Sequence, residues 1–300
     1  MKNKSVNKLI LMIISTALIF ILAPFFVNVP LEGASFPLLS SYSTDKTTDS
    51  ITFLNVGYGD ATLVKSNGKH ILIDTGNGED GSISRLLNNM GVTELEAVIL
   101  TVWKEEHVGG IGDVLDNFTV RKVIMPQISD MSSDDFVIAA ATERIIKKSG
   151  VAFSALSRGL SVTVGDVVLD FIAYSPDYSI VSERSAVIFA KCRDFKVLMM
   201  SDAENLVEES LLKRGLYLKS DVLKVGNHGS KYSSSQKFIE AVDPKHAIIS
   251  VGYKNDKEHP DKTTCSRINN YGADVLRTDT DGTVKVIFGN EKIEIESERK

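Results

Sequence analysis

The chain has 300 residues, of which 43% are hydrophobic and 24% are charged, so it has the balance of an ordinary globular protein of one large or two small domains. The formal net charge is −5, which excludes a general binder of polyanions but allows a local basic groove. The two cysteines, Cys192 and Cys265, lie outside any CxxC pair. This argues against a structural zinc site and favours two buried thiols over a disulfide.

The N-terminal 30 residues differ from the rest. Lys2, Lys4 and Lys8 precede an uncharged run over 9–31 that is long enough to cross a bilayer as a helix. The same layout, followed by small residues at 33–35, is typical of a secretory signal. We favour an uncleaved membrane anchor over a cleaved signal peptide. Both predict an exported domain, either at the cell membrane with its folded part outside or secreted.

The rest of the chain is predicted to be a linker followed by one folded domain. Residues 31–50 are rich in Ser, Thr, Pro and Gly, and the domain is predicted over 51–300. Strands are predicted over 51–56, 61–65, 70–74, 95–100, 121–125, 162–164, 167–173, 186–190, 196–200, 221–225, 247–251, 275–277, 283–288 and 292–296, and helices over 82–90, 110–117, 134–149, 207–214, 236–242 and 262–271.

Turn signals indicate how these elements are connected. Asn67-Gly68 is a strong hairpin signal between two predicted strands, and Arg193-Asp194 marks a second hairpin. Hairpins interspersed with helices predict an α/β (α+β) fold of two mixed sheets packed face to face, with helices outside. Functional residues are then expected on loops that follow strands.

Several polar stretches occupy such places. They are NVGYGD (55–60), IDTG (73–76), TVWKEEHVGG (101–110), SDAE (201–204), KVGNHGSKYSSS (224–235) and EHPD (258–261). From residue types alone, Glu106, His107, Asp202 and His228 form a sensible set of ligands for one zinc or manganese ion. The alternatives are a loop histidine bound to backbone at position 107 and a helix cap at position 202.

Taken in order, these stretches resemble the metallo-β-lactamase superfamily, and more narrowly the C-terminal domain of the competence protein ComEC and its free-standing relatives. The family pattern is roughly FLDVGQGD, ILIDTG, THxHxDHxGG, GDxE, KVxHHGSxxSSS, a GHP-like loop and RTDxxG. This chain carries FLNVGYGD, ILIDTG, TVWKEEHVGG, SDAE, KVGNHGSKYSSS, EHPD and RTDTDG. The resemblance covers about 51–288 and implies an αββα sandwich and a metal-dependent hydrolase.

The departures from the family pattern fall on metal ligands. Val102 and Lys104 replace the first two histidines of the metal motif, and no histidine between 108 and 181 replaces the third ligand of the first metal. The resemblance therefore implies that the first metal site is lost. The second site keeps counterparts in Glu106, His107, Asp202 and His228, although Glu106 is one methylene longer than the family's aspartate.

Two further replacements bear on the second site. Asn227 stands where the family has the first of two adjacent histidines, and Asn55 replaces the opening aspartate. If the family's late ligand is the first of those histidines, Asn227 has removed it, because a neutral amide oxygen is a poor ligand for zinc.

Two residues of TVWKEEHVGG allow two interpretations each. The Lys104 ammonium could lie where the first metal lay and give a fixed positive charge to a phosphate, or it could form an exposed ion pair with Glu105 or Glu106. Trp103 could be a stacking platform for a base or sugar, or it could pack against the fold.

The loop GSKYSSS (229–235) is intact, and in the family it lies beside the site and can contact phosphate. With Lys104, its residues Gly229, Ser230, Lys231 and Ser233 are the predicted phosphate-binding group. A helix N-terminus capped by serines in 233–235 is an alternative that does not exclude this role.

Two hypotheses for function follow. The first is an inactive, ligand-binding family member that holds a phosphodiester or nucleic acid, a cell-wall polymer or a protein partner at the old active site without a metal. The second is a phosphoesterase or nuclease with a single zinc or manganese ion and a bound water as nucleophile. The N-terminal segment would attach either one to a membrane.

Overall fold

The computed structural model describes residues 48–78, 82–128, 133–175 and 181–299. All of these residues belong to one compact unit over 43–300. The predicted membrane span over 9–31 and nearly all of the predicted linker lie outside the described residues. Among the helices that are described, none is long and apolar enough to cross a membrane.

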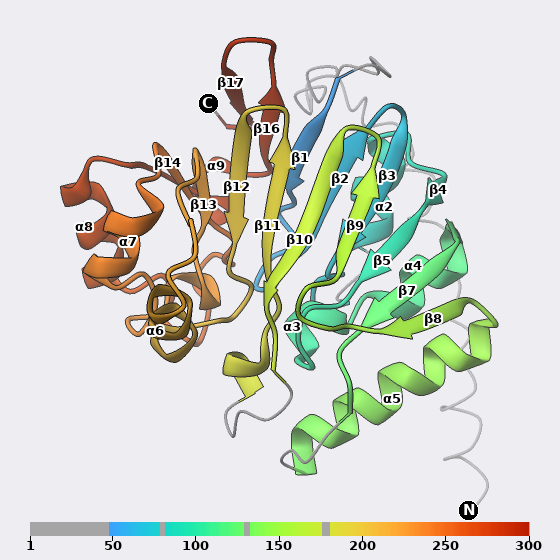
Figure 1. Ribbon diagram of the computed structural model, residues 1–300. Helices are drawn as coiled ribbons and strands as arrows, with labels where there is room; N and C mark the ends of the chain where they lie inside the picture. The colour runs from blue at the N-terminus through green and yellow to red at the C-terminus, as the bar shows by residue number, and fades with distance from the viewer. Residues whose placement is uncertain (1–47, 79–81, 129–132, 176–180, 300) are drawn as a thin grey trace, which may run out of the picture. The chain divides into compact units, whose positions relative to one another are not determined.

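Two mixed β-sheets form the centre of the domain (Figure 1). The first has eight strands in the order β17-β16-β1-β2-β3-β5-β7-β8, and the second has seven in the order β15-β14-β13-β12-β11-β10-β9. Their bounds are β1 Ser50–Phe53, β2 Thr62–Ser66, β3 Lys69–Ile73, β5 Ala97–Ile99, β7 Lys122–Met125, β8 Ala152–Ala155, β9 Ser161–Val164, β10 Val167–Ala173, β11 Val187–Cys192, β12 Phe195–Met199, β13 Val222–Lys224, β14 His246–Ile249, β15 Asp274–Arg277, β16 Val284–Phe288 and β17 Ile293–Ser297; β4 Glu94–Leu95 and β6 Thr119–Val120 pair separately.

Helices cover the outer face of each sheet. Their bounds are α2 Ser82–Asn89, α3 Glu105–Val108, α4 Ile111–Asn117, α5 Ser133–Ser149, α6 Asn205–Lys213, α7 Gln236–Val242, α8 Lys262–Tyr271 and α9 Thr278–Asp281, with 3₁₀ turns at Val181–Arg184 and Asn227–Gly229. One buried core lies between the sheets, a second joins the first sheet to α2, α4 and α5, and a third joins the second sheet to α6, α7 and α8. This confirms the predicted αββα layers.

The alternation of side chains explains how one strand serves two layers. In β10, Val167, Leu169 and Phe171 are buried in the core between the sheets, whereas the intervening residues are partly exposed on the outer face. Both predicted hairpins are confirmed. Asn67 and Gly68 have φ of 50° and 70°, as a type I′ turn requires, and β11 and β12 pair on either side of Arg193.

Several elements differ from those expected, including β6 and α9, which were not predicted. The strand expected over 95–100 is divided between β4 and β5, which pair with different partners. The edge strand β8 was not predicted because all four of its residues are exposed, so it has no apolar alternation. Helix α3 was not predicted because its four residues are fewer than any helical period can reveal. Both cysteines are free thiols, with Cys192 buried and Cys265 partly buried.

Candidate metal and phosphate site

Loops from both sheets meet at one edge of the sandwich. Asp74 directly follows β3, the segment leading into α3 follows β5, Asp202 follows β12, and His228 follows β13. The carboxyl ends of parallel strands point to the same edge, so residues up to 154 positions apart in the sequence are brought into one cluster.

His107 lies on α3 and is fully buried between two carboxylates. Its Nδ1 lies 2.8 Å from Asp74 Oδ2, and its Nε2 lies 3.0 Å from Asp202 Oδ1. Burial disfavours the charged imidazolium, but the Asp202 and Asp74 carboxylates outweigh it and hold the pKa of His107 well above its usual value. The alternative of a loop histidine bound to backbone is therefore wrong.

Asp202 is the centre of the cluster. Its Oδ2 accepts a hydrogen bond from Lys104 Nζ at 2.5 Å, and its Oδ1 faces both His107 and His228, whose Nε2 lies 3.6 Å away. Burial alone would raise the pKa of this carboxyl, but the neighbouring cations Lys104 and His107 hold it well below its usual value. The helix-cap alternative is wrong, because α6 begins at Asn205 after Glu204.

Lys104 is turned into the cluster rather than toward the acidic residues beside it in sequence. Its side chain is 22% exposed, while the side chain of Asp202 is fully buried. Burial opposes its charge, but the ion pair and hydrogen bond with Asp202 raise the pKa of Lys104 above its usual value. The ammonium is therefore a permanent cation at neutral pH.

His228, rather than Asn227, faces the ligand cluster. Its Nδ1 donates to the carbonyl oxygen of Ser250, 2.9 Å away, so Nε2 is the ring nitrogen that faces the cluster. That Nε2 is buried and has no hydrogen-bond partner among the described residues. The side chain of Asn227 instead donates to Glu204 Oε1 at 2.8 Å.

The comparison with protein families agrees with this arrangement of motifs. The model of the metallo-β-lactamase superfamily matches residues 54–253, two thirds of the chain. The chain belongs to this superfamily.

Individual similar proteins indicate which branch of the superfamily this chain resembles. The chain is 28% identical over 276 residues to ComE operon protein 3 of Bacillus subtilis, covering 84% of this chain and 35% of that protein. It is 32% identical over 270 residues to Recombination protein 2 of Haemophilus influenzae, covering 88% of this chain and 32% of that protein. The chain thus spans about a third of the length of these relatives, and the resemblance to ComEC-type competence proteins is confirmed.

Solved structures of the superfamily share the fold. The metallo-β-lactamase fold protein YhfI of Bacillus subtilis matches with a TM-score of 0.53 and 11% identity, over 79% of this chain and 99% of that one. A diphosphatase of the PhnP family matches with a TM-score of 0.50 and 14% identity, over 81% of this chain and 98% of that one. At such low identity these likenesses support the fold alone.

The superfamily's usual pair of metal ions does not fit this donor set. Val102, at the position of the first histidine, is only 1% exposed within the apolar interior, and Lys104 brings a cation to the position of the second. Three donors fit a single ion better: His107, Asp202 and His228 present ligand atoms within 4.8 Å of one another. Glu106 belongs to no such group, and its backbone oxygen accepts the amide of Asp60.

Sequence reasoning missed several residues around this cluster. Asp74 accepts Thr101 N at 2.8 Å and Thr101 Oγ1 at 2.6 Å, which fixes the carboxylate that holds His107. Tyr58 packs on the ring of His228 with centroids 4.6 Å apart, and its hydroxyl lies 3.1 Å from His259 Nδ1. Each of these residues lies in a polar stretch already noted, but residue type alone did not distinguish a supporting residue from a ligand.

The predicted phosphate loop has most of its amides engaged within the protein. Ser230 N and Ser233 N donate to carbonyl oxygens of the same loop, and Ser233 Oγ donates to the Ser230 oxygen. The Glu208 carboxylate accepts Ser234 N at 2.5 Å and Ser235 N at 2.9 Å. The serines therefore do not cap α7 with their hydroxyls. A phosphate role for Gly229, Ser230, Lys231 and Ser233 stays a prediction, with Lys231 as its exposed cation.

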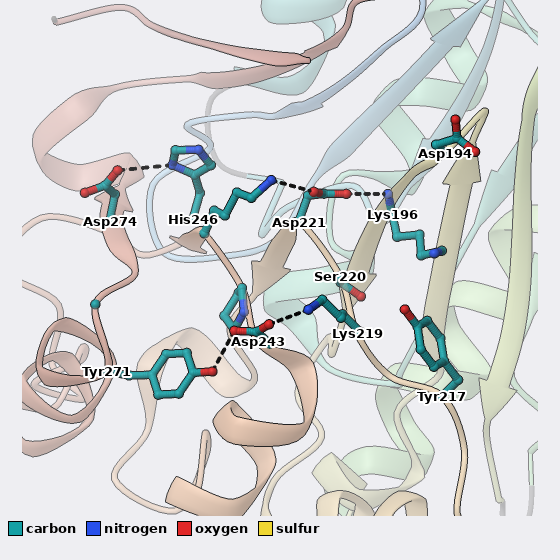
Figure 2. Close-up of a pocket in the computed structure, with 13 residues that line it drawn as sticks. Asp194, Lys196, Tyr217, Lys219, Ser220, Asp221, Asp243, His246, Tyr271 and Asp274 are labelled. Atoms are coloured by element: carbon teal, nitrogen blue, oxygen red, sulfur yellow. Dashed lines mark hydrogen bonds and ion pairs between the residues drawn. The ribbon is translucent and has the colours of Figure 1, made fainter. Parts of the chain in front are cut away.

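Trp103 and one open pocket do not belong to the Asp202 cluster. Trp103 is only 3% exposed and packs in the core under α2, α4 and α5, so the interpretation as a stacking platform is wrong. An open pocket of about 950 Å³ lies near the amino ends of β13, β14 and β15, and its lining includes none of the cluster residues. Figure 2 shows the side chains that line it. Its ion pairs join Lys219 to Asp243 and Lys245 to Asp221, and it includes no residue of the predicted site.

Proposed function

We propose that this domain binds a phosphate-bearing ligand at the Asp202 cluster and does not hydrolyse it with a pair of metal ions. The ion pair of 2.5 Å between Lys104 Nζ and Asp202 Oδ2 carries the proposal. In this pair the permanent positive charge of Lys104 balances the negative charge of the Asp202 carboxylate. The side chain of Lys104 is 22% exposed, and we expect a ligand phosphate to approach the ammonium along this exposed part.

The state of His107 supports a site without metal. A histidine that ligates a metal uses the lone pair of one ring nitrogen. Here both ring nitrogens lie within hydrogen-bonding distance of carboxylate oxygens, at 2.8 and 3.0 Å. Such an imidazolium is a second buried cation beside Asp202, so two protein cations supply the positive charge that metal ions supply in related hydrolases.

Nucleic acid is the ligand class that the relatives favour. Recombination protein 2 is named for recombination, a process of nucleic acids, and Competence protein ComA of Neisseria gonorrhoeae is named for competence. We further propose that the domain is exported behind the N-terminal segment, which would hold it at a membrane. A nucleic acid outside the cell would then be the phosphodiester presented to Lys104.

One observation favours a second candidate function, a mononuclear phosphoesterase. The buried Nε2 of His228 has no hydrogen-bond partner among the described residues, as expected of a ligand awaiting an ion. A divalent ion held by His107, Asp202 and His228 would supply a Lewis acid and an activated water. For this, Lys104 would have to leave Asp202, and His107 would have to lose a proton.

Metal analysis separates the two functions. After expression with added zinc or manganese, we expect no stoichiometric metal in the purified protein. One bound ion per chain that disappears in His107→Ala would instead establish the mononuclear site and refute the metal-free proposal. Hydrolysis of a chromogenic phosphodiester, measured in parallel, should be absent.

Ligand binding is tested with a fluorescein-labelled single-stranded oligonucleotide of mixed sequence. We expect Lys104→Met to weaken binding at least about tenfold, because it removes one charge-assisted contact worth roughly 1.5–3 kcal/mol. Lys213→Met is the matched control, since Lys213 is exposed on α6 and, among the residues that the structure describes, its ion pair is with Glu209. Equal binding by wild type and Lys104→Met would remove Lys104 from the ligand site.

A further inference from the structure

Two adjoining hollows beside β10 share a pair of arginines. The larger is open, measures about 430 Å³ and is lined by Arg158, Arg214 and part of β10. The smaller is lined by the same two arginines and lies at the carboxyl end of this strand. Arg158 belongs to the loop between β8 and β9, and Arg214 directly follows α6. We call the two hollows together the arginine cleft.

The two guanidinium groups of the cleft have no carboxylate partner among the described residues. Arg214 donates from Nη1 to the carbonyl oxygen of Ile172 at 2.8 Å, which holds this group at the end of β10. Arg158 is exposed and makes no hydrogen bond or ion pair in the described part of the chain. Both cations therefore remain available to an external anion, and a planar guanidinium can bind two phosphate oxygens at once.

The carboxylates of the cleft are already engaged within the protein. Asp170 forms an ion pair of 2.5 Å with Lys191, so this pair adds no net charge. Glu183 is 2% exposed and accepts the amide of Val207 at 3.2 Å. An anion that enters the cleft thus meets two available cations and one carboxylate that is held by the start of α6. This balance favours a ligand with negative charge.

A buried hydroxyl and two leucines complete the walls of the cleft. Ser185 lines the smaller hollow, and its Oγ is buried without a hydrogen-bond partner among the described residues. A buried polar group of this kind needs a partner, which a ligand phosphate or a water held by it would supply. Leu160 and Leu216, both partly buried, line the larger hollow. The cleft thus offers polar groups for a phosphate and an apolar wall for the face of a base, which are two parts of a nucleotide.

The arginine cleft lies at the same edge of the sandwich as the Asp202 cluster. Ala173, at the end of β10, pairs with Val187 at the start of β11, and the start of β11 also pairs with the end of β12. Asp202 follows β12, and α6 begins shortly after it and ends directly before Arg214. The nine residues of this helix span about 14 Å. A strand bound at Asp202 therefore reaches the arginines by extending along α6.

We propose that the arginine cleft binds a second phosphate of the nucleic acid strand whose first phosphate lies at Lys104. The guanidinium groups of Arg158 and Arg214 hold this second phosphate, and the neighbouring base lies against Leu160 and Leu216. The inference rests on the proposed function and extends it, because it requires a strand that continues beyond the Asp202 cluster. A ligand too short to follow α6 reaches Lys104 alone.

The test measures how the full chain binds two probes, the fluorescein-labelled single-stranded oligonucleotide and an unlabelled dinucleotide that competes with it. We expect the double variant Arg158→Met with Arg214→Met to weaken oligonucleotide binding at least about tenfold, because charge-assisted contacts to one phosphate are lost. The slope of log affinity against log salt concentration should become shallower by about 0.7, because one phosphate fewer is neutralised on a single strand. The affinity for the dinucleotide should not change.

Three further variants serve as controls. Arg85→Met is the matched control, because Arg85 is an exposed arginine on α2 and lines neither hollow. Arg158→Met alone should also weaken oligonucleotide binding, and it removes no polar contact of the described fold, so misfolding cannot explain its effect. Arg158→Lys keeps the charge but not the planar fork, so we expect it to restore the salt dependence and only part of the affinity. Circular dichroism and thermal melting check that each variant is folded.

The outcomes separate this inference from the proposed function. If Lys104→Met weakens oligonucleotide binding and the double arginine variant does so no more than Arg85→Met, the cleft is refuted and the Asp202 site stands. If the arginines matter and Lys104 does not, the cleft binds the strand by itself and the proposed function fails. A dinucleotide that loses as much affinity as the oligonucleotide would show that the arginines hold no second phosphate. Absence of oligonucleotide binding by the wild type would overturn both proposals.

Discussion

Lys224 and Asp60 form a buried ion pair that joins the two sheets. Lys224 Nζ lies 2.6 Å from Asp60 Oδ2, and both side chains are less than 5% exposed. Asp60 lies in the loop between β1 and β2 of the first sheet, and Lys224 ends β13 of the second. Burial opposes the charge of Asp60, but the positive charges around it, that of Lys224 first, together hold the pKa of Asp60 below its usual value. The pair therefore links the two sheets beside His107, whose Nδ1 is also near the Asp60 carboxylate.

Lys224→Met should be strongly destabilising, because it leaves a buried carboxylate without its cation. We expect the free energy of unfolding to fall by about 3–5 kcal/mol. The double variant Asp60→Asn with Lys224→Met should recover much of this loss, since no buried charge remains. Urea denaturation of the three variants measures both effects. A double variant no more stable than Lys224→Met would show that the lost packing of the lysine stem, not the unpaired charge, is the cause.

Gly110 should not tolerate a side chain. A Cβ at this position would clash with the backbone carbonyl oxygen of Thr75, which is fixed by the loop after β3. Gly110→Ala should therefore cost about 1–3 kcal/mol or more of unfolding free energy. Gly112→Ala is the matched control two residues along, inside α4, where the nearest atom is the Ile145 Cγ2 at 3.9 Å. That change should stabilise the protein by about 0.5–1 kcal/mol. Equal effects in thermal melting would contradict the close approach at Gly110.

Periodicity and turn chemistry predicted the layers well because they are local signals. The Asn67-Gly68 hairpin and the alternation in β10 need only neighbouring residues, and both are confirmed. The Lys104–Asp202 pair was not predicted, because its partners lie 98 positions apart and follow strands of different sheets. Glu106 was predicted as a ligand from its type and motif. On α3, however, it lies one position before His107 and so faces a different direction from the histidine.

The contacts of the phosphate loop could not be predicted either, because they also join residues that are far apart in the sequence. Its Gly and Ser residues suggested free amides, but the acceptor that occupies two of them is Glu208, a residue of α6. Nothing near position 208 in the sequence marks it as a cap for another helix. A motif thus indicates which backbone shape a loop can adopt, while the partners of its amides are decided by the packing of distant elements.

Glu208 should consequently be important for stability. It is 1% exposed and accepts the amides of Ser234 and Ser235 at the start of α7. In Glu208→Gln one amide oxygen remains and an NH₂ group faces the second amide, so a buried donor loses its acceptor. We expect a loss of about 1–3 kcal/mol by urea denaturation. Glu209→Gln, which alters only an exposed pair with Lys213, should stay within about 0.5 kcal/mol of wild type. A similarly small effect at position 208 would show that solvent satisfies these amides.

The raised pKa of His107 predicts how stability depends on pH. The folded state binds this proton more tightly than the unfolded chain, whose histidine titrates near 6.5. The stabilisation is therefore complete below pH 6.5 and is lost as pH rises through the folded pKa. His70 and His259 have lowered pKa values, so their contributions are already constant above about pH 7.5. Tyr58 and Lys104 have raised pKa values and weaken folding only above about pH 10.

Between pH 7.5 and 10, the difference between the wild type and His107→Gln reports on His107. Cys192 and Cys265 have raised pKa values and also weaken folding as pH rises through this interval, but they do so in both proteins. The free energy of unfolding of the wild type should fall more steeply with rising pH than that of His107→Gln, by at most about 1.4 kcal/mol per pH unit, because the variant lacks the titrating proton. The variant should also be less stable at pH 7.5, because Asp74 and Asp202 lose their shared cation. Denaturation at a series of pH values measures both curves. Parallel curves would mean that His107 is neutral at pH 7.5 and free to ligate a metal, which would favour the mononuclear phosphoesterase over the metal-free site.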